Sequence, residues 1–145
     1  MIYNKKPKDF IPDIEVVGCL FLYKDKILLL NRHNNKSEGG KWGIPAGKKD
    51  REDRDIIDAV LREIKEETGL ILKKKDLNFH KTFYVIYPDK KYFYHYYKTE
   101  LKKEVKIIIQ NKEHKDFAWV SVRDALNMPL VLHEDHCIKD CFGIN

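Results

Sequence analysis

Several features that would assign a class of protein at once are missing from this chain. No apolar run approaches the roughly 20 residues of a membrane span, and the first residues lack the apolar core of a signal peptide. Internal repeats, low-complexity tracts and linker-like stretches are also missing. We therefore expect a soluble cytoplasmic protein with no membrane contact. The length of 145 residues predicts a single domain over residues 1–145.

Cysteine is scarce, and its spacing suits neither a disulfide framework nor a common metal motif. The chain has three cysteines, an odd number, and none of them forms a CxxC pair. Cys137 and Cys141 lie one helical turn apart, which raises a zinc site with His133 or His136. We favour simple packing, because cysteine is among the residues most often buried.

The chain has no excess of acidic residues: 28 Lys and Arg outnumber 23 Asp and Glu, and the formal net charge is +5. A positive balance suits phosphate-bearing ligands but does not choose among them. The lysines are scattered along the chain and form no stripe with interleaved aromatic residues. Nucleic-acid binding is therefore permitted by the charge but not indicated by the pattern.

The hydrophobic pattern predicts several strands with a few interspersed helices. Residues 15–23 and 27–30 form an expected hairpin, and residues 78–87 and 92–101 form a second one across a Pro-Asp-Lys-Lys turn. A polar loop over 31–41 and an extended piece over 42–47 separate the first hairpin from the first helix. A short strand over 117–120 precedes expected helices over 122–127 and 130–142. This order predicts a mixed α/β sandwich.

The most informative segment is a helix that carries three glutamates on one face. Each helical residue advances by about 100°, so Glu63, Glu66 and Glu67 fall within one arc of about that width. The apolar residues fall on another face: Ile57, Val60, Leu61 and Ile64. We expect the helix to begin near Asp53 or Asp55, either of which can cap it. A glycine at 69 is well placed to end it.

Hard oxygen ligands on one helix face suit Mg²⁺ or Mn²⁺ and the hydrolysis of a phosphoanhydride. A plain solvated face is the alternative, since Arg62 and Glu66 have the i, i+4 spacing of an ordinary surface pair. Three glutamates so close repel one another, however, and a bound cation would relieve that repulsion. One glutamate in or near the cluster could instead act as general base.

The wider segment GIPAGKKDREDRDIIDAVLREIKEETGL resembles the signature of the Nudix hydrolases. That signature has a glycine, an acidic residue about six positions on, and then Arg-Glu-hydrophobic-any-Glu-Glu-any-Gly-hydrophobic. Gly47 matches the first glycine. The second half is matched completely by Arg62, Glu63, Ile64, Glu66, Glu67, Gly69 and Leu70.

The match departs from the family pattern at one point, because Gly47 and Arg62 are one residue further apart than usual. Counting forward from Gly47 places the first acidic position at Asp53. Counting back from Arg62 places it at Arg54. Glu52 and Asp53 therefore both remain candidates for this position.

The resemblance implies a Nudix-type α/β/α sandwich with a mixed sheet and a metal-binding helix. It implies Mg²⁺ or Mn²⁺ as cofactor, with Glu66 and Glu67 as metal ligands and Glu63 as a further ligand or polar anchor. The carbonyl group of Gly47 would join the metal shell. Arg62 would orient the carboxylates through salt bridges.

Other positions resemble the family more weakly. Glu113 is a candidate extra ligand or general base, and His114 beside it is a weaker candidate; a solvated loop is the alternative. Arg32 and His33 could meet the substrate phosphate or simply lie at the mouth of the loop, and Lys48 could face phosphate or simply be exposed. In the run 92–97, alternate tyrosines could stack on a base, although sheet packing accounts for most of them.

The sequence therefore predicts a pyrophosphohydrolase that cleaves a diphosphate linkage in a nucleoside diphosphate derivative and releases a nucleoside monophosphate. A nucleoside triphosphate or a nucleotide sugar is the expected small-molecule substrate. The alternatives are removal of diphosphate from the 5′ end of RNA, and a nucleotide-binding module without catalysis. Both a monomer and a homodimer are compatible with the sequence.

Overall fold

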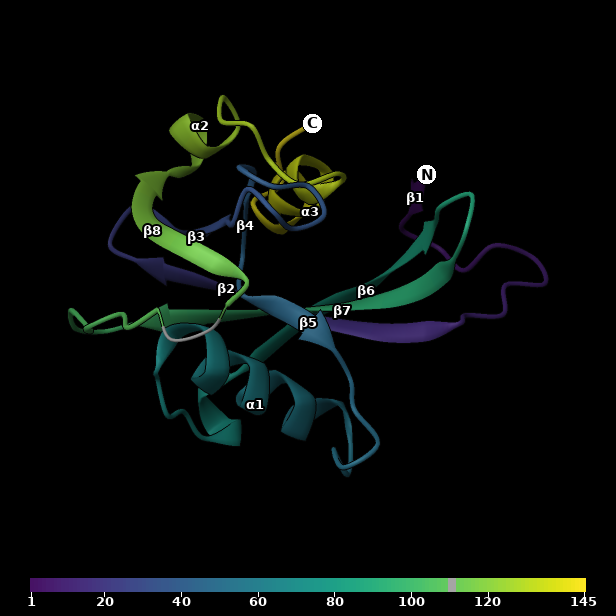
Figure 1. The fold of residues 1–145 in the computed structure, drawn as a ribbon, viewed down its shortest axis with the longest axis horizontal. Coiled ribbons are helices and arrows are strands. Elements are labelled where there is room, and N and C mark those ends of the chain that lie inside the picture. Colours follow the sequence, from purple (N-terminus) through teal and green to yellow (C-terminus); the bar gives the residue numbers. More distant parts are fainter. Residues whose placement is uncertain (110–111) are drawn as a thin grey trace.

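The computed structural model describes residues 1–109 and 112–145, and within them eight strands form one mixed sheet (Figure 1). The strands are β1 (Ile2–Tyr3), β2 (Ile14–Tyr23), β3 (Lys26–Arg32), β4 (Trp42–Gly43), β5 (Ala46–Lys48), β6 (Asn78–Ile86), β7 (Lys91–Leu101) and β8 (His114–Ser121). The helices are α1 (Ile56–Thr68), α2 (Val122–Ala125) and α3 (Glu134–Cys141), with a 3₁₀ turn at Lys74–Asp76.

Strand β2 organises the sheet because it has partners along both edges. One edge pairs in parallel with β7, from Ile14 opposite Tyr92 to Tyr23 opposite Leu101. The other edge pairs with β5 over residues 16–18 and then with β3 over residues 22–23, both antiparallel. This change of partner brings β5 beside the start of β2. The segment that precedes α1 is thereby held against the middle of the sheet.

The helices cover opposite faces of the sheet, with α1 on one side and α2 and α3 on the other (Figure 1). The alternation of side chains along the strands supplies one apolar core to each face. The core under α1 contains Val17, Phe21, Leu28, Val60 and Ile64. The core under α3 contains Leu20, Leu29, Phe83, Tyr96 and Ile138. The expected α/β sandwich with a mixed sheet is confirmed.

Both predicted hairpins are present within a residue or two of their expected limits. Strands β2 and β3 turn at Lys24–Asp25, and β6 and β7 turn at residues 87–90. The expected short final strand is longer than predicted, since β8 begins at His114. Strand β8 lies antiparallel to β3. From the sequence, only β2, the other strand of the first hairpin, is expected to pair with β3.

The predicted helix over 130–142 is wrong at its start, because α3 covers only Glu134–Cys141. Leu130 instead forms a parallel bridge with Trp42, and the N–H group of Val131 donates to the Trp42 carbonyl at 2.8 Å. His133 adopts a left-handed conformation with φ 72°. Backbone pairing with β4 therefore replaces the first helical turn. The predicted helix over 122–127 is likewise shorter, as α2 ends at Ala125.

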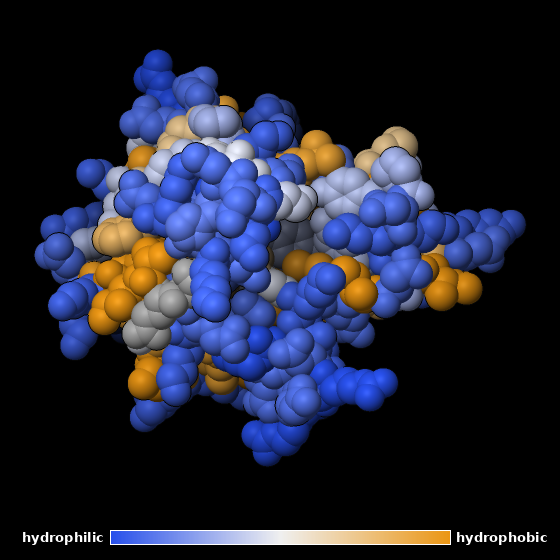
Figure 2. All heavy atoms as spheres, viewed as in Figure 1, coloured by the Kyte–Doolittle hydropathy of each residue, from blue (hydrophilic) through white to orange (hydrophobic). Residues whose placement is uncertain are grey.

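The surface of the molecule is mainly hydrophilic in the view of Figure 2, with apolar residues in separate small groups. Cys137 is buried beside Ile138 in the core under α3, as expected for a packing role. Among the described residues, no helix is long and apolar enough to cross a membrane.

Candidate active site

The helix α1, which carries the three glutamates, has well-defined ends. The side chain of Asp55 caps the first turn and accepts a hydrogen bond from the Asp58 N–H at 2.9 Å. Gly69 ends the helix with φ 78°, a conformation that favours glycine, and its N–H group donates to the Lys65 carbonyl. The expected helix is confirmed, and Asp55 rather than Asp53 is its cap.

Arg62 connects the loop before α1 to the glutamates on it. Its Nε and Nη2 donate to the two carboxylate oxygens of Asp53 at 3.0 and 2.9 Å. Its Nη1 donates to Glu63 at 2.9 Å and to Glu66 at 3.2 Å, and Nη2 also reaches the Lys48 carbonyl at 2.9 Å. The hydrogen bonds from Arg62 lower the pKa of Asp53. One guanidinium group thus fixes the carboxylates relative to one another.

These contacts distinguish the two candidates for the first acidic position. Asp53 is buried and holds Arg62 bidentately, whereas Glu52 is exposed. Asp53 is also the residue reached by counting forward from Gly47. The additional residue of this chain therefore lies between Asp53 and Arg62. Arg54, which the backward count selects, is exposed and outside this network.

Glu67 is the most deeply placed of the three glutamates, with 1% of its surface exposed. Its Oε1 accepts a hydrogen bond from the Ala46 N–H at 2.9 Å. Within the described residues, its Oε2 accepts no hydrogen bond. Burial, together with the neighbouring Glu63 carboxyl group, raises the pKa of Glu67 well above its usual value. A buried carboxylate oxygen of this kind is stabilised when it binds a cation or carries a proton.

Glu63 lies directly over β5 and depends on a glycine there. A Cβ atom at position 47 would overlap the carboxyl group of Glu63, so Gly47 makes room for it. Burial raises the pKa of Glu63 to about 7, with Arg62 opposing this shift. Glu66 lies further out, and 53% of its side chain is exposed. The helix thus presents one deep, one intermediate and one outer carboxyl group.

The start of β8 supplies a second wall to the same site. Glu113 is exposed and His114 is buried. Glu67, Glu113 and His114 each offer one side-chain oxygen or nitrogen atom, and these three atoms lie within 4.8 Å of one another. Nδ1 of His114 is 3.8 Å from Oε2 of Glu67. Burial, and then the charge of Arg32, lowers the pKa of His114 to about 4, so its ring is neutral at physiological pH. A neutral imidazole and two carboxylates form a set of donors suited to a divalent cation.

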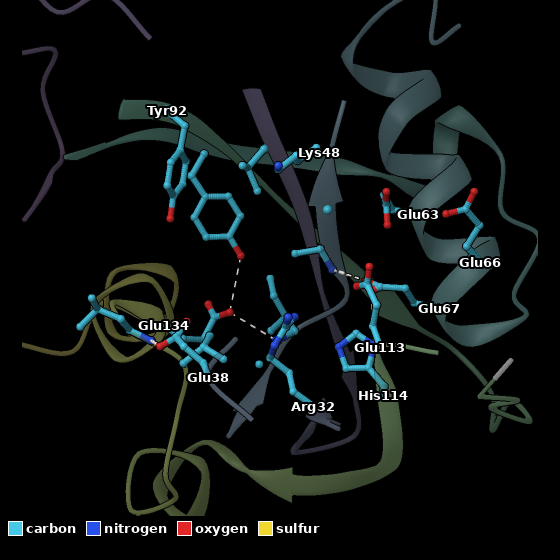
Figure 3. Close-up of a pocket in the computed structure, with 18 of the residues that line it drawn as sticks. Arg32, Glu38, Lys48, Glu63, Glu66, Glu67, Tyr92, Glu113, His114 and Glu134 are labelled. Carbon is cyan, nitrogen blue, oxygen red and sulfur yellow. Dashed lines mark hydrogen bonds and ion pairs between the residues drawn. The ribbon is translucent and has the colours of Figure 1, made fainter. Parts of the chain in front are cut away.

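These groups face a pocket of about 610 Å³, a volume suited to a small ligand. Figure 3 shows Glu63 and Glu66 on one side of this pocket. Tyr92, Glu38 and Glu134 lie on the other side. Of the predicted phosphate contacts, Arg32 and Lys48 both line the pocket as well. The structure thus brings these predicted residues together, whereas His33 is not among the residues that line the pocket.

The side of the pocket away from α1 is aromatic. The rings of Tyr87 and Tyr92 lie 5.7 Å apart between centroids, at an interplanar angle of 35°. Tyr94 and Tyr96 are buried, and their hydroxyl groups donate to Glu134 at 3.5 and 3.1 Å. One end of the pocket is therefore built from carboxylates and the other from tyrosines around a single buried acid.

Sequence reasoning did not identify Glu134 or Glu38 as site residues. Both stand among polar residues with no periodic pattern, and the residues that surround Glu134 come from β4 and β7. A single sequence carries no signal for such a non-local arrangement. The tyrosine run did contain a signal, because its alternation separates the two faces of β7, but it could not show which tyrosines reach a pocket.

A mixed sheet between α1 and the α2–α3 layer, with a glycine-ended helix that aims its carboxylates into a pocket, defines an α/β protein of Nudix architecture. The sequence model of the NUDIX domain family matches residues 13–141. The chain therefore belongs to the Nudix family of pyrophosphohydrolases, whose members cleave nucleoside diphosphate linkages and typically use divalent metals. No curated protein sequence matches it.

Solved structures support the same architecture. The NUDIX domain of Shewanella oneidensis NrtR, complexed with ADP ribose, aligns with a TM-score of 0.80 at 23% identity, over 97% of this chain and 93% of that one. A MutT protein from Methanosarcina mazei Go1 aligns with a TM-score of 0.71 at 25% identity, over 90% and 92%.

A bifunctional NMN adenylyltransferase/ADP ribose pyrophosphatase from Francisella tularensis, complexed with AMP and a Mn ion, aligns with a TM-score of 0.74 at 21% identity. The alignment covers 93% of this chain and 42% of that longer one. At such identities the likeness establishes the fold and leaves the substrate open.

Proposed function

We propose that this chain, as one domain over residues 1–145, hydrolyses a diphosphate linkage in a small nucleotide and depends on Mg²⁺ or Mn²⁺. A nucleoside triphosphate or a nucleotide sugar is the proposed substrate, and a nucleoside monophosphate is the proposed product. The observation that carries this proposal is the buried Oε2 of Glu67, which accepts no hydrogen bond from the described residues and faces a cluster of further ligand atoms.

The residues present fit a divalent cation. Glu63, Glu66 and Glu67 would hold it from α1, and the Gly47 carbonyl would contribute from β5. Glu113 would either complete the ligand set or take the proton of the attacking water, since it is exposed at the pocket mouth. When bound, the cation would neutralise charge on the phosphate oxygens and lower the pKa of a bound water.

The remaining charged residues would position the carboxylates and the substrate. Arg62 acts as a positioning residue, because all of its donors are engaged by the loop before α1 and by the glutamates. Arg32 and Lys48 line the pocket and would meet the substrate phosphates. Nε of Arg32 donates to the Ser37 carbonyl at 2.7 Å, which ties this side chain to the loop before β4.

A nucleotide panel with phosphate detection, run with Mg²⁺ and with Mn²⁺, tests the proposal. We expect hydrolysis by the wild type and a large loss in a Glu66→Gln, Glu67→Gln double variant. The matched control is Glu52→Gln, which removes an exposed acid outside the network. Calorimetry with Mn²⁺ on the same proteins tests the ligand assignment. Absence of hydrolysis across the panel, or unchanged Mn²⁺ affinity in the double variant, would overturn it.

Two alternatives give different results in the same assays. Removal of diphosphate from RNA would favour a triphosphorylated oligonucleotide over free nucleotides, with a steeper loss of activity as salt rises. A binding module without catalysis would retain nucleotide and release no phosphate. The convergence of Glu63, Glu66 and Glu67 on one pocket supports the catalytic proposal over this module.

A further inference from the structure

The tyrosine-lined end of the pocket contains a carboxyl group that the hydrolysis itself does not use. Glu134 is the first residue of α3, and 3% of its surface is exposed. Figure 3 shows it across the pocket from Glu63 and Glu66. An acid this buried is costly unless its oxygens are occupied by donors. Its surroundings therefore indicate what it is arranged to bind.

Three donors from the protein hold Glu134 as an acceptor. The hydroxyl of Tyr96 donates to Oε2 at 3.1 Å. The backbone N–H of Ile44 and the hydroxyl of Tyr94 donate to Oε1, but at 3.3 and 3.5 Å. Both contacts to Oε1 are long for hydrogen bonds. Oε1 therefore retains capacity for a stronger donor, and an ionised carboxylate can only accept.

A glycine in β4 lies beside Oε1 of Glu134. A Cβ atom at Gly43 would lie 3.6 Å from Oε1 of Glu134 and 3.0 Å from a methyl group of Val131. A side chain at this position would therefore contact the carboxylate oxygen. Gly43, Val131 and Glu134 all line the pocket. A side chain at position 43 would therefore take up space in the pocket next to Glu134.

The neighbouring tyrosines form a surface for a flat ring. Tyr87 and Tyr92 both line the pocket, with their ring centroids 5.7 Å apart. Tyr92 lies on the same side of the pocket as Glu134 (Figure 3). Aromatic side chains of this kind stack on any base, because every base has a π face. Stacking alone would not distinguish the bases, whereas a carboxylate at the edge of the stacked ring would.

We propose that Glu134 selects a guanine base, so that this chain acts on guanine nucleotides in preference to other nucleotides. This inference rests on the proposed function, since it names the base of the same substrate. Guanine presents two adjacent N–H donors, N1–H and the exocyclic amino group, on one edge. Adenine and cytosine place a ring acceptor beside their amino group, and uracil flanks its N–H with two carbonyl groups. A carboxylate is attracted by the first edge and repelled by the acceptors of the others.

Binding of nucleoside monophosphates without metal, measured by calorimetry at about pH 8, tests this selection. GMP, IMP and AMP form the series, because IMP lacks the amino group and AMP also replaces N1–H with an acceptor. We expect GMP to bind at least about tenfold more tightly than AMP, with IMP between them, as for a hydrogen bond to a charged group. Equal binding of the three, preference for AMP, or no binding of GMP would overturn the proposal.

Variants test whether Glu134 carries this preference. Glu134→Gln replaces one acceptor with a donor, and Gly43→Ala places a methyl group beside Oε1 while leaving the acid in place. We expect the GMP preference over AMP to fall below about threefold in each. Asp135→Asn is the matched control, since it removes an exposed acid from the same helical turn. Retention of the preference in either test variant, with circular dichroism showing a folded protein, would overturn the role of Glu134.

The outcome is separable from that of the proposed function. Loss of hydrolysis across the nucleotide panel, with the GMP preference intact, would defeat the proposed reaction alone. Hydrolysis of all nucleotides at similar rates, with no GMP preference in binding, would defeat only the selection by Glu134.

Discussion

The two ends of the pocket hold their carboxyl groups in opposite ways. At the α1 end, Glu63 and Glu66 lie one turn apart and share the guanidinium group of Arg62. At the tyrosine end, Glu134 is the buried acid, and its donors among the described residues are two hydroxyl groups and one backbone N–H. Glu38, which is half-buried, lies on the same side of the pocket. The first arrangement places three carboxyl groups along one helix face, and the second surrounds one buried carboxyl group with neutral donors.

This difference corresponds to the tasks of the two ends. A concentration of carboxylates suits a cation that brings phosphates with it. A buried carboxylate that is held by neutral donors suits the recognition of N–H groups on an uncharged base. A base without those N–H groups binds poorly, because the buried carboxylate then lacks a hydrogen-bond partner. If both proposals hold, one pocket uses acidic groups in two ways: a cluster to bind a cation, and one buried carboxylate to select a base by hydrogen bonding.

The largest expected effect comes from the deepest group of the α1 end. Glu67→Gln should lower hydrolysis roughly a thousandfold, because it removes a buried ligand worth several kcal/mol of transition-state stabilisation. The thermal midpoint of this variant should stay the same or rise. Burial disfavours the ionised form of Glu67 and so raises its pKa, and a neutral amide avoids that cost. Steady-state kinetics and thermal melts check both. Substantial residual activity would show that the site is centred elsewhere.

At the tyrosine end, the largest expected effect is on stability. Burial raises the pKa of Glu134 from 4.5 to about 7, so the folded protein keeps a proton that the unfolded chain releases between these values. The free energy of unfolding therefore falls as pH rises through this window, by up to about 3 kcal/mol from this group. Above about pH 7 the loss is complete.

Denaturant unfolding at pH 5 and pH 8 measures this contribution. Glu134→Gln cannot titrate, so its unfolding free energy should fall less between the two conditions, by about 1 to 3 kcal/mol relative to the wild type. Asp135→Asn provides the exposed control and should retain the wild-type fall. Equal pH dependence of wild type and Glu134→Gln would show that this carboxyl group titrates normally.

The two ends also differ in how far the sequence predicted them. The α1 end could be predicted because its glutamates repeat at i, i+3 and i+4 on one helix, where local geometry fixes their spacing. Even there, burial was not evident: Glu67 is 1% exposed, whereas the side chain of Glu66 is 53% exposed. The prediction that the three glutamates share one helix face was correct. How deeply each of them is buried depends on β5, which packs against that face.

The tyrosine end could not be predicted because its parts meet only in the folded sheet. The parallel pairing of β2 with β7 joins residues nearly 80 positions apart, and nothing in either strand names its partner. The error at 130–133 has the same origin. Those residues carry a helical pattern, yet Leu130 and Val131 pair with Trp42, which positions α3 and Glu134 beside the pocket.

The support beneath the α1 end should be less sensitive than its ligands. Asp53→Asn weakens the bidentate contact with Arg62, because an amide offers the guanidinium group only one oxygen. It should lower hydrolysis about ten- to a hundredfold, as is typical for residues that orient ligands. Glu52→Gln, one position earlier, should leave the rate unchanged because Glu52 is exposed. Kinetics of the two variants, measured in parallel, decide whether Asp53 or Glu52 positions Arg62. Equal losses would contradict the assignment of Asp53.

The smallest expected effect concerns Arg54, the residue that the family spacing selects when counted back from Arg62. Its Nε donates to Asp58 at 2.8 Å, one turn along α1, but 88% of its side chain is exposed. Exposed pairs of this kind contribute little, so Arg54→Ala should change hydrolysis by less than about twofold and leave the thermal midpoint within error. A loss comparable to that of Asp53→Asn would mean that the additional residue lies before Asp53, and that the loop ahead of α1 follows the backward count instead.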